Sequence, residues 1–334
     1  MVQLQTFISF VFVLGMLVLA HEMGHFVVAR IHGITVYEFS IGFGPVLWST
    51  KPKETQYSLR ALPLGGYVRM MGEDDTSDDV NSFSQKKPWQ RFTVLIAGPL
   101  MNFVLAVLLY TIIFASIGSA TTVVDSVEKG FPGAVAGIEK GDRIVSIANK
   151  EIDSWQTLAT LVPTLKQSFP VVVERKGQTK TFNLKTQKDK DGRQIIGILP
   201  TRDKSLVTAL GMGSQTTGDI AKSIFQFLGQ MVTGKAKADG VVGPVGIYNV
   251  VGQASQAGLL PLLEVAAVIS VNLAIFNLLP IPALDGGWLV FIVYEMVFRK
   301  PFNRQTQEKL QYAGFMLLML LMLFTIGKDM KLFG

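Results

Sequence analysis

The sequence contains no cysteine, and only 17% of its 334 residues are Asp, Glu, Lys or Arg. Without cysteine, the chain has no disulfide framework, no cysteine metal site and no thiol nucleophile. The shortage of charge accompanies a hydrophobic content of 49% and a mean hydropathy of +0.37. This composition excludes an ordinary soluble protein and points to a membrane protein with one water-exposed module.

Several stretches are apolar enough and long enough to form membrane-spanning helices. They cover residues 4–31, 92–117, 259–297 and 312–326. The first lacks a basic residue in front of it and exceeds the length of a signal-peptide core, so we expect a retained helix. The third exceeds one simple crossing and is interrupted by Pro280, Pro282 and Gly286-Gly287. We therefore expect a polytopic α-helical membrane protein with about four transmembrane helices.

The intervening stretches have different patterns. Residues 33–71 alternate apolar and polar side chains and are rich in glycine and aromatics, which predicts a membrane-associated β-hairpin element. Residues 121–200 have the composition of an inserted α+β domain. Residues 205–234 read as an amphipathic helix at the membrane interface. The predicted domains are residues 1–118 with the first two spans, 119–201 as the inserted domain, 202–256 as the interfacial segment, and 257–334 with the last two spans.

Basic residues predict the orientation in the membrane. Lys and Arg cluster in the loop between the first two spans and in the loop between the last two. Such loops stay cytoplasmic, so both termini and the inserted domain are expected on the extracytoplasmic side. This topology also accounts for the net charge of +6 without nucleic acid, which is not expected as a partner.

The sequence His21-Glu22-Met23-Gly24-His25 lies inside the first apolar span. On a helix, His21 and His25 share one face and can bind one metal ion, while Glu22 can take a proton from the attacking water. Burying these groups in lipid is costly unless they have a function. The alternative is a pair of helix-packing histidines with Glu22 as an interhelical hydrogen-bond partner.

A catalytic zinc site needs a third protein ligand. His32 and Glu38 lack the helical spacing of a third ligand, so we predict Asp285, within the sequence NLLPIPALDGG. The alternative for Asp285 is a helix-capping role at a Pro/Gly kink. Asn277 can stabilise an oxyanion or hold a substrate carbonyl, or it can form an interhelical hydrogen bond. Asn102, like Asn272, is expected to be a packing residue.

Five motifs occur in one order: HEMGH, GFGP, LPLGGYV, AGPLMNF and NLLPIPALDGG. Together they resemble the site-2 protease family, in its bacterial regulator-of-sigma branch, over nearly the whole chain. The resemblance implies a Zn²⁺ metalloendopeptidase of the bacterial inner membrane that cuts membrane-spanning proteins, often an anti-sigma factor. It maps His21, His25 and Asp285 to the zinc ligands, Glu22 to the general base and Asn277 to a substrate contact.

The same resemblance assigns two peptide-binding elements. It maps the LPLGGYVRM segment to a membrane β-element whose edge strand pairs with substrate. The inserted domain resembles a bacterial PDZ domain with a turn that binds a peptide tail. The residues implied are Gly65, Gly66, Tyr67 and Val68 in the β-element and Phe131, Pro132, Gly133 and Ala134 in the PDZ turn. Some relatives carry two PDZ domains, whereas this chain has room for one.

Three other functions are compatible with parts of this pattern. The main alternative is a catalytically inert membrane scaffold whose PDZ domain binds tails, and it predicts that Glu22 is dispensable. A metal transporter would repeat its polar sites in two halves of the chain, and no such repeat is found. A membrane-anchored protease of soluble type would carry the histidine motif in the water-exposed domain rather than in a span.

Overall fold

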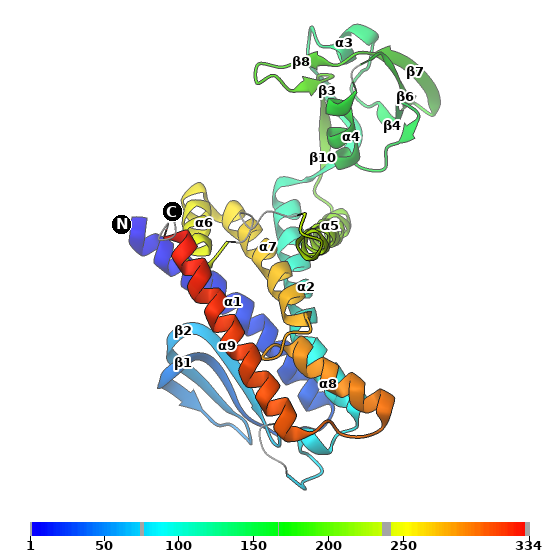
Figure 1. Ribbon diagram of the computed structural model, residues 1–334. Coiled ribbons are helices and arrows are strands. Elements are labelled where there is room, and N and C mark those ends of the chain that lie inside the picture. The colour runs from blue at the N-terminus through cyan, green and yellow to red at the C-terminus, as the bar shows by residue number, and fades with distance from the viewer. Residues whose placement is uncertain (1, 74–76, 166, 236–241, 331–334) are drawn as a thin grey trace. The chain divides into compact units, whose positions relative to one another are not determined.

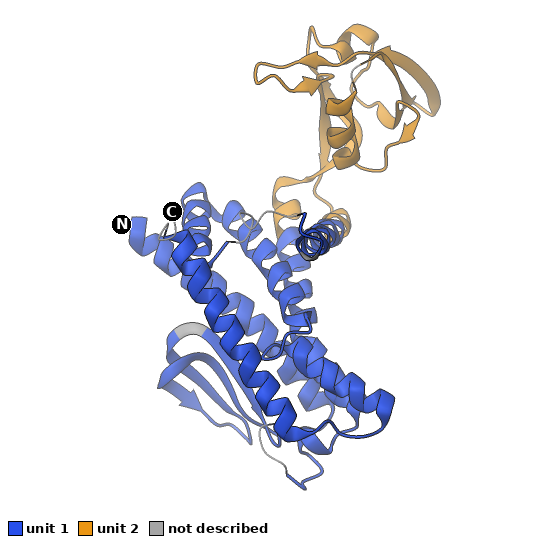
Figure 2. Cartoon of the chain, viewed as in Figure 1, with its two compact units in different colours: residues 1–111, 213–334 blue, residues 112–212 orange. Residues whose placement is uncertain are grey.

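The computed structural model describes residues 2–73, 77–165, 167–235 and 242–330 (Figure 1). The chain forms two compact units, shown in different colours in Figure 2. Unit 1 comprises residues 1–111 and 213–334, and unit 2 comprises residues 112–212. The first span, the sheet that follows it and the last spans thus belong to one unit, although they come from opposite ends of the sequence.

Unit 1 is built mainly from apolar helices. The described part of the chain contains four helices that are long and apolar enough to cross a bilayer, as expected. They are α1 (Val2–Ile31), α2 (Pro88–Ile117), α7 (Leu259–Leu278) and α9 (Arg304–Asp329). Their surfaces expose many large apolar side chains, such as Phe315 and Leu320 on α9. Such exposure is stable in lipid but not in water, which agrees with spanning helices.

The third expected span, residues 259–297, is two helices rather than one. After α7 the chain turns over residues 279–284 and then begins α8 (Asp285–Phe298). Pro280 and Pro282 cause this break, because proline lacks the N–H that a continuing helix needs. The remaining helices of this half are α5 (Leu206–Val232), with a marked apolar face, and α6 (Pro244–Ala257), which packs on α1 and α7.

The expected β-element consists of two long strands, β1 (Val36–Thr50) and β2 (Gln56–Met70). Their pairing is more complex than a simple hairpin. Residues 38–41 lie opposite residues 56–59 and also opposite residues 66–69, so β2 folds back along both sides of β1. Gly42 and Gly44 supply positive φ angles of 89° and 82° within β1, which allow the bend.

A half-buried arginine ties the bent strands together. Arg60 donates hydrogen bonds to Glu38 Oε1 at 2.7 Å, to the Gly44 carbonyl at 2.8 Å and to the Tyr67 hydroxyl at 2.8 Å. Because these partners come from separate parts of the sheet, one side chain fixes their positions. The stretch of residues 66–70 is left at an edge, with a strand partner on one side only within the described residues.

Unit 2 is a small α+β domain whose main strands follow the order β10-β3-β4-β6-β7. Its elements are β3 (Ser119–Val127), α3 (Pro132–Ala136), β4 (Arg143–Ile147), β5 (Lys150–Glu151), α4 (Trp155–Leu161), β6 (Phe169–Arg175), β7 (Gln178–Leu184), β8 (Gln187–Lys188), β9 (Gln194–Ile195) and β10 (Ile198–Asp203). Its core is aliphatic, centred on Ile147, Val171 and Val173. The hairpin of β6 and β7 turns at Lys176-Gly177, where both residues have positive φ.

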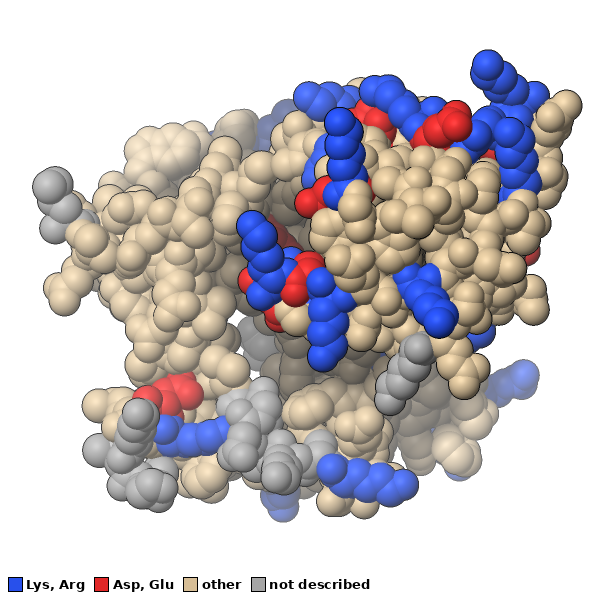
Figure 3. Space-filling view, turned by 90° about the horizontal axis from the view of Figure 1, so that it is seen from above, with Lys and Arg blue, Asp and Glu red and all other residues tan. Residues whose placement is uncertain are grey.

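Most of the net positive charge lies on unit 2. Residues 112–212 contain fourteen Lys and Arg against ten Asp and Glu, which gives +4 of the net +6 of the chain. In Figure 3 the basic side chains are spread over this unit with acidic ones among them, whereas much of the remaining surface on the face shown is uncharged. Long folded domains largely escape the positive-inside rule. The orientation in the membrane therefore depends on the basic residues of the loops in unit 1.

Candidate metal centre

His21 and His25 lie four residues apart on α1 and point in the same direction. Both are buried, with 9% and 7% of their surfaces exposed. Their rings meet edge to face, with centroids 4.8 Å apart. One helical turn separates them, so their Nε2 atoms come within 3.1 Å of each other. This is the convergence that the histidine motif predicted.

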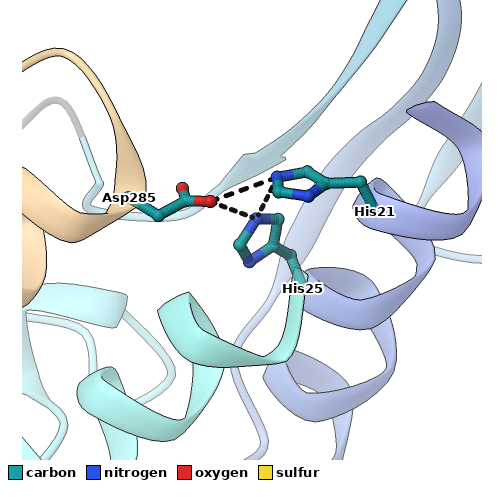
Figure 4. A group of neighbouring side chains, drawn as sticks. All are labelled: His21, His25 and Asp285. Atoms are coloured by element: carbon teal, nitrogen blue, oxygen red, sulfur yellow. Dashed lines mark hydrogen bonds and ion pairs between the residues drawn. The ribbon is translucent and has the colours of Figure 1, made fainter. Parts of the chain in front are cut away.

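Asp285 reaches the histidines from the first turn of α8 (Figure 4). The turn before it is compact because two glycines follow. A Cβ on Gly286 would lie 2.1 Å from the Leu279 carbonyl oxygen, and one on Gly287 would lie 2.6 Å from the Ile281 carbonyl oxygen. Only glycine fits such approaches. The Pro/Gly sequence around Asp285 thus shapes the turn that aims its carboxylate at α1.

The three side chains form a triangle of donor atoms. Asp285 Oδ2 lies 3.1 Å from His21 Nε2 and 3.6 Å from His25 Nε2, and all ligand atoms lie within 4.8 Å of one another. Ligand atoms at about 2.0–2.1 Å from a tetrahedral zinc ion are about 3.3 Å apart. Two histidines and one carboxylate, with a fourth position left open, are the ligand set of a catalytic zinc site.

The hydrogen bonding of His25 and Asp285 is also compatible with a cation bound between the three side chains. His25 Nδ1 lies 2.8 Å from the Val94 carbonyl and must donate to it, so its Nε2 presents a lone pair. Asp285 Oδ2 is buried and receives no well-aligned hydrogen bond from the described residues. His25 Nε2 and Asp285 Oδ2 therefore each offer a lone pair toward the centre of the triangle. A bound Zn²⁺ satisfies this arrangement.

Glu22 lies beside the triangle, on the side that faces the edge of the sheet. Val68, in the edge stretch of β2, lines the same cavity as Glu22. A Cβ on Gly66 would lie 3.4 Å from Glu22 Cγ, which shows how closely the strand approaches α1. Glu22, both histidines and Asp285 line one cavity of about 190 Å³, together with Tyr67, Val68, Met70, Glu73 and Leu95. The predicted base, the three predicted ligands and two of the four predicted edge-strand residues, Tyr67 and Val68, thus line one cavity.

Other predicted residues lie elsewhere. Asn277, at the C-terminal end of α7, is half-buried and is not among the described residues that line this cavity. In unit 2, Phe131–Ala134 run into the start of α3, where the Gly133 N–H already donates to the Ile196 carbonyl at 2.8 Å. The roles assigned to these residues remain predictions. His32, excluded as a ligand, is hydrogen-bonded to Thr93 Oγ1 at 2.8 Å.

One face of α2 contributes to the site in a way that the sequence reasoning did not anticipate. Val94, Gly98 and Asn102 recur every four residues and face the two histidines. A Cβ on Gly98 would lie 2.3 Å from His25 Nε2, and one on Gly24 of α1 would lie 2.2 Å from a carbonyl of α2. Small residues at these positions allow the helices to pack closely. The Gly98-Pro99-x-x-Asn102 pattern inside a span was the available signal.

Comparison with known proteins gives a consistent result. The model of peptidase family M50 matches residues 9–321. A chain from Clostridium acetobutylicum that bears the name of a zinc metalloprotease is 39% identical over 319 residues, covering 94% of each chain. The regulator of sigma-W protease RasP of Bacillus subtilis is 31% identical over 415 residues, covering 98% of each chain.

Solved structures match a smaller part of the chain. The PDZ domain of an SdrC-like protein from Listeria monocytogenes is 23% identical and covers 24% of this chain and 85% of its own, with a TM-score of 0.22. The family model and the curated relatives, by contrast, extend over nearly the whole sequence. The chain therefore belongs to peptidase family M50, the site-2 protease family, and is a multi-pass membrane zinc metalloprotease.

Proposed function

We propose that this protease hydrolyses peptide bonds within or next to the transmembrane segments of other proteins in a bacterial inner membrane. The proposal rests on one observation, which is that the proposed catalytic residues lie inside a helix that can span the membrane. His21, Glu22 and His25 belong to α1, which is itself apolar enough to cross a bilayer. A protease that acts on soluble chains has no reason to bear the cost of placing these groups there.

Hydrolysis needs water, which lipid excludes, so the site needs a polar route. The cavity of the metal centre and a second cavity of about 430 Å³ share Glu73 as a lining residue. The second cavity is lined by charged groups that include Arg91, Glu295 and Glu308. It supports entry of water from the side of the basic loops, the cytoplasmic side in the proposed topology. The termini and unit 2 are then extracytoplasmic.

The reaction assigned to the site is peptide hydrolysis with Glu22 as general base. When bound by His21, His25 and Asp285, zinc polarises the scissile carbonyl and makes water more acidic. Glu22 takes a proton from the attacking water as the new C–O bond forms. It then returns that proton to the leaving amide nitrogen as the C–N bond breaks. Asn277 is the proposed partner of the substrate backbone.

The substrate is proposed to bind as an extended strand along residues 66–70. A helical segment hides its peptide bonds, so it must unwind before cleavage, and strand addition stabilises the unwound form. Gly66, Tyr67 and Val68 lie in the edge stretch of β2, and Gly65 directly precedes it, which supports this assignment. Tyr67 and Val68 line the same cavity as Glu22, so a strand added here passes the proposed catalytic base.

The proposed substrate class is a membrane-spanning regulator of a sigma factor. The name of the Bacillus subtilis relative, a regulator of sigma-W protease, supports it. Unit 2 is proposed to bind a peptide tail near Phe131–Ala134. The N–H of Gly133 already donates to the Ile196 carbonyl, so Gly133 is proposed to shape the turn and not to donate to the tail. The positive charge of unit 2 favours a tail with an acidic end, such as a free carboxylate.

The test is cleavage of a model transmembrane substrate by detergent-purified protein, with bound zinc measured in parallel. Wild type is expected to cut, and Glu22→Gln is expected to keep its zinc while losing at least about 100-fold in rate. Glu264→Gln, a substitution of the same chemistry on α7, serves as the matched control. Cleavage by Glu22→Gln at the wild-type rate would contradict the role of Glu22. Zinc binding without cleavage of any transmembrane substrate would contradict the proposed substrate class.

A further inference from the structure

Asn102 on α2 is completely buried and lies next to the outer nitrogen of His21. Its Nδ2 atom is 3.4 Å from His21 Nδ1, and its Oδ1 atom has no hydrogen-bond partner among the described residues. Its own carbonyl oxygen accepts a hydrogen bond of 2.8 Å from Ser270 Oγ on α7. The backbone of Asn102 is therefore tied to α7, while its side chain faces α1 with one acceptor left unsatisfied. An unsatisfied buried acceptor is costly.

Both histidines need a hydrogen-bond acceptor for Nδ1, the ring nitrogen that points away from the metal position. A histidine that binds metal through Nε2 carries its proton on Nδ1, and that proton needs an acceptor. For His25 the acceptor is the Val94 carbonyl, 2.8 Å away. For His21 the neighbouring group is the Asn102 amide. With Nδ2 toward the ring, two donors face each other and Oδ1 is left unpaired.

Exchanging the oxygen and nitrogen of this amide turns the donor–donor contact with His21 into a hydrogen bond. The two atoms occupy equivalent positions, and the hydrogen-bond network decides between them. With Oδ1 toward His21, the Nδ1–H of the ring gains an acceptor and the unsatisfied oxygen gains a donor. We propose that Asn102 is the positioning residue of His21, which holds the ring in the tautomer that offers Nε2 to zinc. This inference rests on the zinc ligands of the proposed function.

Zinc affinity of the full-length protein in detergent tests this role without any substrate. Competition with a chelator of known affinity measures zinc binding for wild type, Asn102→Leu, Asn102→Ala and Asn102→Asp. We expect Leu and Ala to weaken zinc binding 10–100-fold, since outer-shell partners of metal histidines have effects of this size. Asp keeps an acceptor facing His21 Nδ1 and is expected to stay within about threefold of wild type.

A packing role for Asn102 predicts the reverse order. Leu would then be tolerated in this apolar helix, and Asp would be harmful because it buries a charge. Wild-type zinc affinity in Asn102→Leu, or weaker binding in Asp than in Leu, would overturn the proposal. Thermal unfolding of the zinc-free proteins identifies variants that fail to fold, and if Leu is one of them, the Ala and Asp pair decides.

Asn272→Leu on α7 is the matched control. Its amide donates to the Val268 carbonyl of its own helix at 2.9 Å and contacts no metal ligand among the described residues. Its zinc affinity is expected to equal that of wild type. Because zinc binding is measured without cleavage, the proposed function and the role of Asn102 can be refuted independently. Wild type that binds zinc but cuts nothing refutes the proposed function, whereas Asn102→Leu with full affinity refutes only the inference.

Discussion

Replacing Gly98 by alanine adds one methyl group at the contact between α2 and the metal centre. The added carbon would lie 2.3 Å from His25 Nε2 and 2.5 Å from His25 Cε1. The imidazole has little room to move away. It is 93% buried, and its Nδ1 is held by the Val94 carbonyl at 2.8 Å. The smallest possible addition to the side chain therefore meets a zinc ligand directly.

The size of the effect follows from these distances. Since Cβ atoms are essentially never found closer than 3.0 Å to such an atom, the ring must shift by about 0.7 Å or the helices must separate. Zinc sites tolerate changes of about 0.2 Å in ligand distance. We therefore expect Gly98→Ala to lose His25 as a ligand. Zinc affinity should fall by more than about 100-fold, because losing an outer-shell partner already costs 10–100-fold.

The assay is the chelator competition, combined with cleavage of a transmembrane substrate. Gly15→Ala on α1 is the matched control, because no atom of the described residues lies within 4 Å of the added carbon. Alanine favours a helix over glycine, so this variant should bind zinc as wild type does. Normal zinc binding and cleavage by Gly98→Ala would refute the packing of α1 against α2 described here, and with it the assignment of His25 Nε2 as a ligand atom.

Three further predictions concern the sheet, unit 2 and the metal. A Cβ on Gly66 would lie 2.6 Å from the Ser40 carbonyl oxygen, so Gly66→Ala should displace the edge strand. We expect at least a tenfold loss of cleavage with unchanged zinc binding, and equal cleavage would contradict the role of the strand. In unit 2, burial alone would raise the pKa of Asp142, but hydrogen bonds from Arg175 and a backbone amide hold that pKa below its usual value. The stabilisation is therefore complete above the unfolded pKa of about 3.9 and is lost as pH falls through the lower folded value. Arg175→Met should destabilise unit 2 by about 3–5 kcal/mol at pH 7, as measured by limited proteolysis in denaturant, because it leaves a buried charge unpaired. Lys140→Met, which removes an exposed ion pair, should change stability by less than about 1 kcal/mol, and equal effects of the two variants would contradict this reasoning. Finally, removal of zinc by a strong chelator should abolish cleavage and added zinc should restore it, whereas cleavage that persists without metal would exclude the proposed mechanism.

Local patterns in the sequence were sufficient for the helices and for most of the metal centre. Length and hydropathy identified the apolar spans, because a bilayer requires about 20 apolar residues in a row. The spacing of His21 and His25 placed them on one helical face, since that relation depends only on helix geometry. Asp285 was identifiable because a carboxylate among prolines and glycines in an apolar stretch needs a partner.

Local sequence patterns did not predict the strand order and register of the β1–β2 sheet. Alternation predicted strands over residues 33–71, but it did not reveal that residues 38–41 have neighbours on both sides. Register and strand order depend on which segments meet in space, through the glycine bends and the hydrogen bonds of Arg60. For the same reason, the sequence did not show that residues 66–70 end at an edge beside Glu22.

The sequence by itself determined the class of protein and the histidine motif, and it predicted Asp285 as the third ligand, because each of these depends on composition or on spacing within one segment. The tertiary structure alone decided what surrounds the ligands. The contact of Gly98 with His25 and that of Asn102 with His21 join α1 to α2, some 70 to 80 residues apart in the chain. Periodicity in one helix shows which face is polar or small, but it carries no information about the helix that packs against that face.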